Sequence, residues 1–352
     1  MSDSTSRAVE TADPKSVYSA LDTAVSDVLI GNERIIEGLT IALLTRGHVL
    51  LEGVPGVAKT TIANAFSRAI GLEYSRIQMT PDVLPADITG TYIYREQTGE
   101  FDLRKGPIFA NVVVADEINR ATPKTQSALL EAMQERQVTI EGETLQLPEP
   151  FLVIATQNPI EMDGTFELAE AQRDRFALKY QVDLPDREAE SALFDRFNST
   201  PELGPEVIEP VVDAETLLEA RAQISEVYVS DPVRDYILDI VAETRSDPGL
   251  EHGGSPRATL TFLNAGKARA AIHGRAYVLP DDIKTLVLPV LVHRLVRNTD
   301  SRLSDRSTTE IIQDIVKSVP SPGSEASFEP PAETSTETET QTETKSEAEA
   351  EQ

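Results

Sequence analysis

The chain has 352 residues, 40% of them hydrophobic, which is enough for about two domains with a sizeable core. Its formal net charge of −27 would repel nucleic acid at long range, so nucleic acid is not an expected partner. The absence of Cys excludes disulfides and thiolate metal sites, and the four histidines lack the spacing of metal ligands.

The first half of the chain has the pattern of a helical start followed by a parallel sheet. After a polar stretch at residues 1–14 that we expect to be disordered, two amphipathic helices are predicted within residues 15–45, joined at Ile30-Gly31-Asn32. Short apolar runs then predict buried strands near residues 47–52, 74–78, 111–116, 151–156 and 177–181.

Two segments between these strands alternate in the manner of β-hairpins. Residues 91–103 alternate around Thr98-Gly99, and residues 137–147 alternate around Glu141-Gly142. The expected fold is therefore α/β, with an αβα core over residues 15–185 that carries two inserted hairpins.

The turn after the first predicted strand has the composition of a phosphate-binding loop. Backbone N–H groups of such a turn and the positive end of the next helix face an anion, and a lysine adds a point charge. The pattern G-x-x-x-x-G-K-[ST] is missed at Ala58, which puts a positive φ there in doubt. Taken alone, an ordinary Gly/Pro turn is the competing interpretation. The loop consists of Gly53, Val54, Pro55, Gly56, Val57, Ala58, Lys59, Thr60 and Thr61.

The third predicted strand, N-V-V-V-A-D-E, ends in two acids at the edge where open α/β sheets bind ligands. Asp116 would complete a Mg²⁺ site with the hydroxyl of Thr60, and Glu117 would act as general base on the attacking water. A strand followed by a charged loop is the common alternative. Lys59 and Asp116 are far enough apart for an intervening helix and strand, which favours a nucleotide site.

Three further side chains are candidates for contact with the γ-phosphate. Asn158 ends the fourth strand and could orient water or sense the phosphate, although Asn-Pro is also typical of a turn. Arg173 and Arg175 lie two residues apart in a predicted helix, where such positions do not share a face. One of them could reach the γ-phosphate of a neighbouring subunit.

Helical periodicity dominates residues 186–318 and predicts an α-helical lid domain. Ser255 is a good N-cap and Pro256 a good first residue for one of its helices, so Arg257 opposes the positive end of the dipole. Such a conflict often marks a functional position, and a surface salt bridge is the alternative. The lid helices are predicted near residues 213–223, 231–243, 258–273, 281–297 and 304–317.

Residues 319–352 are rich in Pro, Ser, Thr and Glu and predict a disordered acidic tail.

Together these segments resemble a MoxR-type AAA+ ATPase. The resemblance runs in order from about Val28 to Ala258, and alanine before the P-loop lysine is usual in that family. The inserted hairpins also resemble insertions of this group and would face a central pore or the partner, unless they only brace the sheet edge. The matching segments are V-L-I-G-N, G-V-P-G-V-A-K-T, T-P-D-V-L-P-A-D-I-T-G, F-A-N-V-V-V-A-D-E-I-N-R-A, T-Q-N-P-I-E, E-A-Q-R-D-R-F-A-L-K and G-S-P-R-A.

The resemblance implies a homo-oligomer, a hexamer, that binds ATP and Mg²⁺ between subunits. It assigns Lys59 and Thr60 to the first Walker motif, Asp116 and Glu117 to the second, and the joint at Ile30 and Gly31 to the adenine. It also makes Asn158 sensor 1, Arg175 the arginine finger in preference to Arg173, and Arg257 sensor 2.

The implied function is ATP hydrolysis that remodels, assembles or activates a client protein, as a chaperone does. The resemblance suggests a client with a von Willebrand factor A domain. A nucleotide-dependent switch without force generation is one alternative. A DNA-directed motor of the MCM type is another, although this chain lacks zinc-ligand cysteines, an N-terminal DNA-binding domain and a basic stripe.

The acidity is spread along the chain, because the tail holds only nine of the 59 acidic residues. Arg outnumbers Lys by 23 to 9, a bias that resembles proteins of salt-accumulating archaea. We therefore hypothesise a halophilic source, the alternative being an ordinary acidic protein. The polar start and the lack of an apolar run near ~18 residues predict neither a signal peptide nor membrane insertion, so a cytoplasmic protein is expected.

Overall fold

The computed structural model describes residues 11–97, 99–159, 165–200, 202 and 204–323. The predicted disorder at residues 1–10 and 324–352 lies outside these described residues. Among the helices that are described, none is long and apolar enough to cross a membrane.

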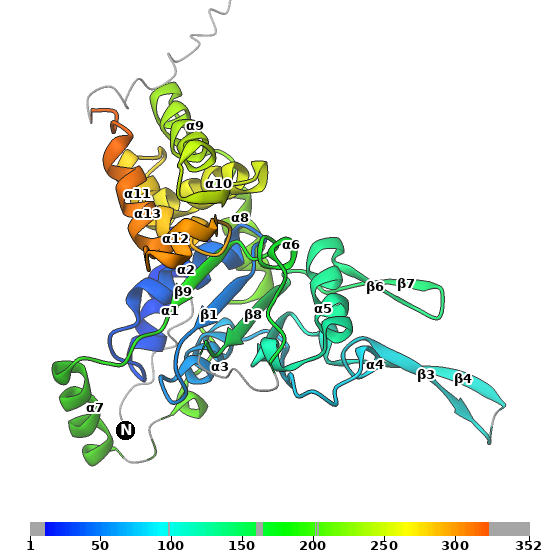
Figure 1. Cartoon of the computed structure of the whole chain (residues 1–352). Coiled ribbons are helices and arrows are strands. Elements are labelled where there is room, and N and C mark those ends of the chain that lie inside the picture. Colours follow the sequence, from blue (N-terminus) through cyan, green and yellow to red (C-terminus); the bar gives the residue numbers. More distant parts are fainter. Residues whose placement is uncertain (1–10, 98, 160–164, 201, 203, 324–352) are drawn as a thin grey trace, which may run out of the picture.

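A five-stranded parallel sheet lies at the centre of the molecule (Figure 1). Its strand order is β2-β5-β8-β1-β9, and all neighbouring strands are parallel. Every strand lies close to its predicted position, which confirms the predicted sheet. The strands span Val49–Glu52 (β1), Tyr74–Gln78 (β2), Val112–Asp116 (β5), Leu152–Gln157 (β8) and Leu178–Gln181 (β9).

Helices cover both faces of the sheet, as an αβα core requires. Because side chains alternate along a strand, Val112 and Val114 pack with α1–α3, whereas Val113 and Ala115 pack with α4 and α5. All five residues of β5 are buried, so Asp116, its last residue, is held on an interior strand of the sheet. These helices span Pro14–Ser26 (α1), Glu33–Leu44 (α2), Lys59–Ile70 (α3), Pro85–Thr89 (α4) and Pro123–Glu135 (α5).

Both predicted hairpins are present and extend away from the sheet on the side of α4 and α5 (Figure 1). They touch, because the Tyr92 hydroxyl of the first hairpin donates a hydrogen bond to Glu143 of the second. The first hairpin also exposes an aromatic pair, Tyr94 and Phe101, whose ring centroids lie 5.2 Å apart. The strands are Gly90–Arg95 (β3), Glu100–Lys105 (β4), Gln137–Ile140 (β6) and Glu143–Gln146 (β7).

Helices dominate the chain after the sheet, as predicted, and α9–α13 pack together as the lid (Figure 1). They are joined by a short antiparallel pair, β10 and β11. The elements are Arg187–Ser199 (α7), Ala214–Ile224 (α8), Asp231–Ser246 (α9), Leu250–His252 (β10), Pro256–Ile272 (α10), Pro280–Leu291 (α11), Val296–Arg297 (β11), Thr299–Leu303 (α12) and Thr308–Ser318 (α13).

Three details of the lid prediction were wrong. The predicted helix 281–297 ends at Leu291, because residues 296–297 pair with β10. The predicted helix 304–317 begins only at Thr308, where Ser307 and Glu310 form a capping box, and α12 precedes it. Helix α7 was not predicted individually; Leu193, Phe194 and Phe197 lie on it at helical spacing, but none of its residues is buried.

His48 is a buried neutral histidine that ties β1 to its neighbours. Its Nε2 donates to the Met133 carbonyl at 3.1 Å, and its Nδ1 accepts from the Val153 N–H at 3.0 Å. Burial lowers the pKa of His48 to about 4, from 6.5 when exposed.

Acidification should therefore destabilise the protein. Between pH values of about 6.5 and 4 the unfolded chain binds a proton on His48 and the folded chain does not. The free energy of unfolding therefore decreases as the pH decreases, by up to ~3 kcal/mol for this group. His48→Gln should be less stable at pH 7 but lose part of this pH dependence. Urea unfolding between pH 7 and 5 measures it, with exposed His252→Gln as control; equal slopes for all three proteins would contradict the assignment.

Candidate active site

The phosphate-type loop connects β1 to α3 in the predicted place. Gly53 must be glycine, because a Cβ there would come within 2.3 Å of the Val182 carbonyl oxygen. Gly56 has φ of 86°, and a Cβ on it would meet no heavy atom within 4 Å. The loop therefore has open space in front of its backbone. Its N–H groups and the N-terminal end of α3 are suited to an anion such as a phosphate.

Ala58 adopts the left-handed conformation that the sequence left in doubt. It is the N-cap of α3, with φ of 63° and ψ of 21°. A left-handed residue other than glycine is strained by roughly 1–2 kcal/mol. The loop geometry thus follows the glycine pattern although the glycine is missing.

Ala58→Gly should relieve this strain and stabilise the protein. The gain is reduced by the larger entropy of unfolded glycine, so a net effect of up to about 1 kcal/mol is expected. Urea unfolding would measure it, with Ala65→Gly as the control, because Ala65 lies in the right-handed interior of α3 and its replacement should destabilise the protein. A loss of stability in both variants would mean that Ala58 is not strained.

Lys59 and Thr60 begin α3 with their polar groups directed to the loop and to β5. The Lys59 ammonium donates to the carbonyls of Gly53 at 2.5 Å and Val54 at 2.9 Å. The Thr60 hydroxyl lies 3.1 Å from both carboxylate oxygens of Asp116. The structure therefore brings the two predicted motifs together.

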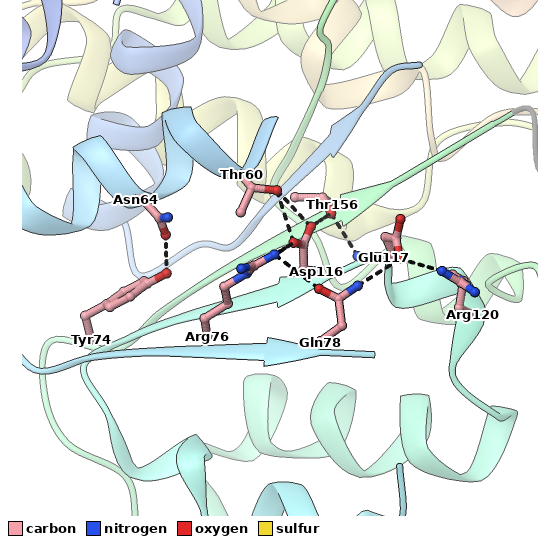
Figure 2. Close-up of polar contacts among 9 residues, drawn as sticks. All are labelled: Thr60, Asn64, Tyr74, Arg76, Gln78, Asp116, Glu117, Arg120 and Thr156. Atoms are coloured by element: carbon pink, nitrogen blue, oxygen red, sulfur yellow. Dashed lines mark hydrogen bonds and ion pairs between the residues drawn. The ribbon is translucent and has the colours of Figure 1, made fainter. Parts of the chain in front are cut away.

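Asp116 is buried, with only 5% of its surface exposed, and has three partners (Figure 2). Besides Thr60, the Thr156 hydroxyl donates to it at 2.5 Å, and the Arg76 guanidinium approaches it to 2.5 Å. Two hydroxyls and one cation thus fix the orientation of this carboxylate. Arg76 is half-exposed, so its side chain has room to move away.

Glu117 stands just beyond the strand in a left-handed conformation, with φ of 56°. Its N–H donates to the Thr156 hydroxyl at 2.9 Å, so one hydroxyl contacts both acids. Its carboxylate accepts from Gln78 Nε2 at 2.8 Å and from Arg120 Nη1 at 2.9 Å (Figure 2). The side chain proposed as general base is thereby oriented and retains free acceptor capacity.

Sequence reasoning missed the contribution of β2 to this site. Tyr74, Arg76 and Gln78 point to one face of the strand, where they contact Asn64, Asp116 and Glu117 respectively (Figure 2). Their two-residue spacing was a visible signal. It could not be interpreted without the strand order, which puts β2 beside β5.

A cleft of about 2330 Å³ runs between the core and the lid. Ile30 and Gly31, predicted to lie against adenine, line it together with loop residues 56–58. Helix α11 and the segment 295–297 line its lid side. The cleft is thus bounded by the predicted adenine joint, the phosphate-type loop and the lid.

The remaining predicted residues lie around this centre rather than in it. Asn158 is buried, and its carbonyl accepts from Asn119 at 3.1 Å, next to the loop that follows Glu117. Arg257 is half-exposed and lies 3.8 Å from Asp174.

The two arginines near β9 are not on one helix, which corrects the prediction. Helix α6 spans only Glu170–Arg173, so Arg175 lies beyond its end. The two side chains still point to different places: Arg173 lines the large cleft, and Arg175 lines a small pocket with residues of α5 such as Glu131.

A P-loop after the first strand, paired acids at the end of an interior strand and a helical lid define an AAA ATPase. Residues 48–178 match the family described as "ATPase family associated with various cellular activities (AAA)", and residues 242–315 match "AAA lid domain". The chain is 43% identical to chaperone MoxR1 of Mycobacterium tuberculosis, over 82% of this chain and 78% of that protein. It is 30% identical to protein MoxR of Methylorubrum extorquens, over 87% of this chain and 94% of that one.

The fold is shared with the crystal structure of a Cytophaga hutchinsonii protein assigned as an ATPase, with a TM-score of 0.81 and 39% identity. That match covers 88% of this chain and 96% of the other. The chain belongs to the MoxR family of AAA ATPases, as the sequence motifs had indicated. It therefore binds and hydrolyses ATP, and its family indicates an oligomer.

Proposed function

We propose that this ATPase uses ATP hydrolysis at subunit interfaces to remodel, assemble or activate a client protein. The observation that carries the proposal is the contact of Thr60 with Asp116 beside an open phosphate-type loop. The similarity to a mycobacterial protein named as a chaperone supports a chaperone-like role.

In this proposal the phosphates of ATP accept hydrogen bonds from backbone N–H groups of residues 53–60, with adenine near Ile30 and Gly31. Lys59 now donates to two carbonyls of its own loop, and it would exchange these for phosphate oxygens. Because the two carbonyls partly satisfy the ammonium without nucleotide, the lysine is held close to the place where it is needed.

The oxygen donors of the site suit Mg²⁺, which prefers one or two protein ligands together with phosphate oxygens and water. Thr60 would hold it directly and Asp116 through water, and Mg²⁺ would supply charge neutralisation at the β- and γ-phosphates. Arg76 pairs with the Asp116 carboxylate in this structure, and its partly exposed side chain has room to move away when Mg²⁺ binds.

We propose Glu117 as the base that takes a proton from the attacking water, and Asn158 as the residue that orients this water. Arg175 of a neighbouring subunit would stabilise the charge on the transferring phosphoryl group. Arg257, on the first turn of α10, would couple hydrolysis of the nucleotide to movement of the lid. The output of the cycle is then a change of angle between core and lid.

We propose a hexamer as the assembly and a protein with a von Willebrand factor A domain as the client. The two hairpins on the side of α4 and α5 are candidate contacts for the client or the pore.

A cytoplasmic location and a halophilic source stay predictions from composition. Full activity and assembly without molar salt would argue against a halophilic source.

The ATPase rate measured against protein concentration in molar KCl, with light scattering on the same samples, tests the shared-site mechanism. Turnover should rise together with a hexamer-sized mass. Turnover that is independent of concentration, at a monomeric mass throughout, would contradict the shared site and favour a nucleotide switch without force generation.

A further inference from the structure

The lid holds the core segment that carries the two candidate finger arginines. Asp174, which lies between Arg173 and Arg175, accepts a hydrogen bond from Arg294 Nε at 2.8 Å. The Ser255 hydroxyl lies 3.2 Å from the same carboxylate. Arg294 follows α11 and Ser255 caps α10, so two lid elements meet on one core carboxylate.

Arg294 is a buried cation, with 2% of its side chain exposed. Besides Asp174 it donates to the carbonyls of Phe176 at 2.7 Å and Ala177 at 3.1 Å, and to that of Val290 near the end of α11. The guanidinium therefore joins the end of α11 to the backbone that leads into β9. Asp174 is its carboxylate partner among the described residues.

His293 adds a second connection to the same backbone. Its Nε2 lies 3.0 Å from the Phe176 carbonyl, to which it donates. Burial and the neighbouring Arg294 hold the pKa of His293 well below its usual value, so the ring is neutral. Two successive lid side chains thus bind one carbonyl of the core.

The segment held in this way separates two surfaces. Arg173 lines the cleft between core and lid of its own subunit. Arg175, two residues on, lines the small pocket beside α5, where Ser127 and Gln137 also lie. A displacement of Asp174 would therefore change the position of Arg175 beside α5 together with that of Arg173 in the cleft.

We propose that Asp174 and Arg294 form a positioning pair, through which the lid of an ATP-bound subunit sets Arg175 for the active site of its neighbour. This inference rests on the shared-site function proposed above. A lid rotation must either carry residues 174–177 with it or separate Arg294 from Asp174. Separation would leave a buried guanidinium without its counter-charge, which is strongly unfavourable, so the segment follows the lid.

Mixed oligomers of the full-length chain test this link, because they assign hydrolysis to one subunit type. An Arg175→Ala subunit keeps its own P-loop and acids but offers no finger. A Glu117→Gln subunit binds ATP and offers a finger but does not hydrolyse. Turnover in the mixture, above that of each variant alone, then comes from the Arg175→Ala sites next to a Glu117→Gln neighbour.

The test adds Asp174→Asn to the Glu117→Gln donor. We expect turnover in the mixture to fall by about tenfold or more, while ATP binding and oligomer mass of the donor stay unchanged. Asp195→Asn, added to the same donor, is the matched control, since Asp195 is an exposed carboxylate of α7 outside the proposed site. It should leave the mixture active.

Misfolding of the donor is separated from loss of positioning by a second donor, which combines Glu117→Gln with Asp174→Asn and Arg294→Met. It replaces the buried guanidinium and the partly exposed carboxylate by groups without charge, and it should fold while still failing to support turnover. Full turnover with either Asp174→Asn donor would overturn the positioning role. A silent mixture with the plain Glu117→Gln donor would instead overturn the shared site itself.

Discussion

Replacing Glu117 by Gln should leave ATP binding intact and lower hydrolysis by roughly 10²–10⁴-fold, the usual contribution of a general base. The amide keeps the size of the side chain, and its oxygen can still accept from Gln78 and Arg120, but it cannot take a proton from water. Gln78 and Arg120 hold the native carboxylate at 2.8 and 2.9 Å, so its loss removes an oriented base rather than a mobile acid.

Single-turnover hydrolysis and equilibrium binding of a fluorescent ATP analogue would separate the two effects. Glu188→Gln, an exposed change on α7, is the matched control and should behave as the wild type. Unchanged turnover in Glu117→Gln would show that another group activates the water. Weakened binding alone would instead place Glu117 among the ligands that hold the nucleotide.

The sheet, the hairpins and the phosphate-type loop could be predicted because each has a local signature. The β5 run V-V-V-A-D is apolar throughout because both of its faces are buried. The hairpins show alternation around a glycine, and the loop shows its glycines and lysine at fixed spacing. In each case the determining interactions lie within a few residues along the sequence.

The parts that could not be predicted depend on contacts between distant residues. Arg76 and Gln78 become part of the site only because β2 lies next to β5. The end of α11 is set by the pairing of β11 with β10 and by the buried contacts of Arg294 with the core. Helix α7 packs no residue into the core, so the helical spacing of Leu193, Phe194 and Phe197 does not say where the helix lies.

The finger assignment also depends on a contact that this chain does not make by itself. In a single subunit, loop residues 56–58 and the lid line one cleft, but Arg175 lies on another surface, beside α5. The separation follows from the short helix α6, which ends before Arg175. A role for Arg175 in catalysis therefore requires a neighbouring subunit whose cleft meets this surface.

Arg175→Ala should accordingly lower turnover by about 10³-fold or more in assembled protein, because an arginine finger contributes 10³–10⁵ in the best cases. ATP binding should persist, since the P-loop of the same subunit is untouched. The oligomer mass from light scattering, measured with the turnover, distinguishes loss of catalysis from loss of assembly.

Arg173→Ala is the informative comparison, because Arg173 lines the cleft of its own subunit. If Arg175 is the finger, Arg173→Ala should alter the affinity for ATP more than the rate of the chemical step. The two roles would have to be exchanged if the Arg175→Ala protein assembled with normal turnover and the Arg173→Ala protein did not hydrolyse ATP. Arg173 would then be the finger. The positioning pair would still lie between them, since Asp174 is adjacent to both arginines, and its effect would then be on the cleft of the same subunit.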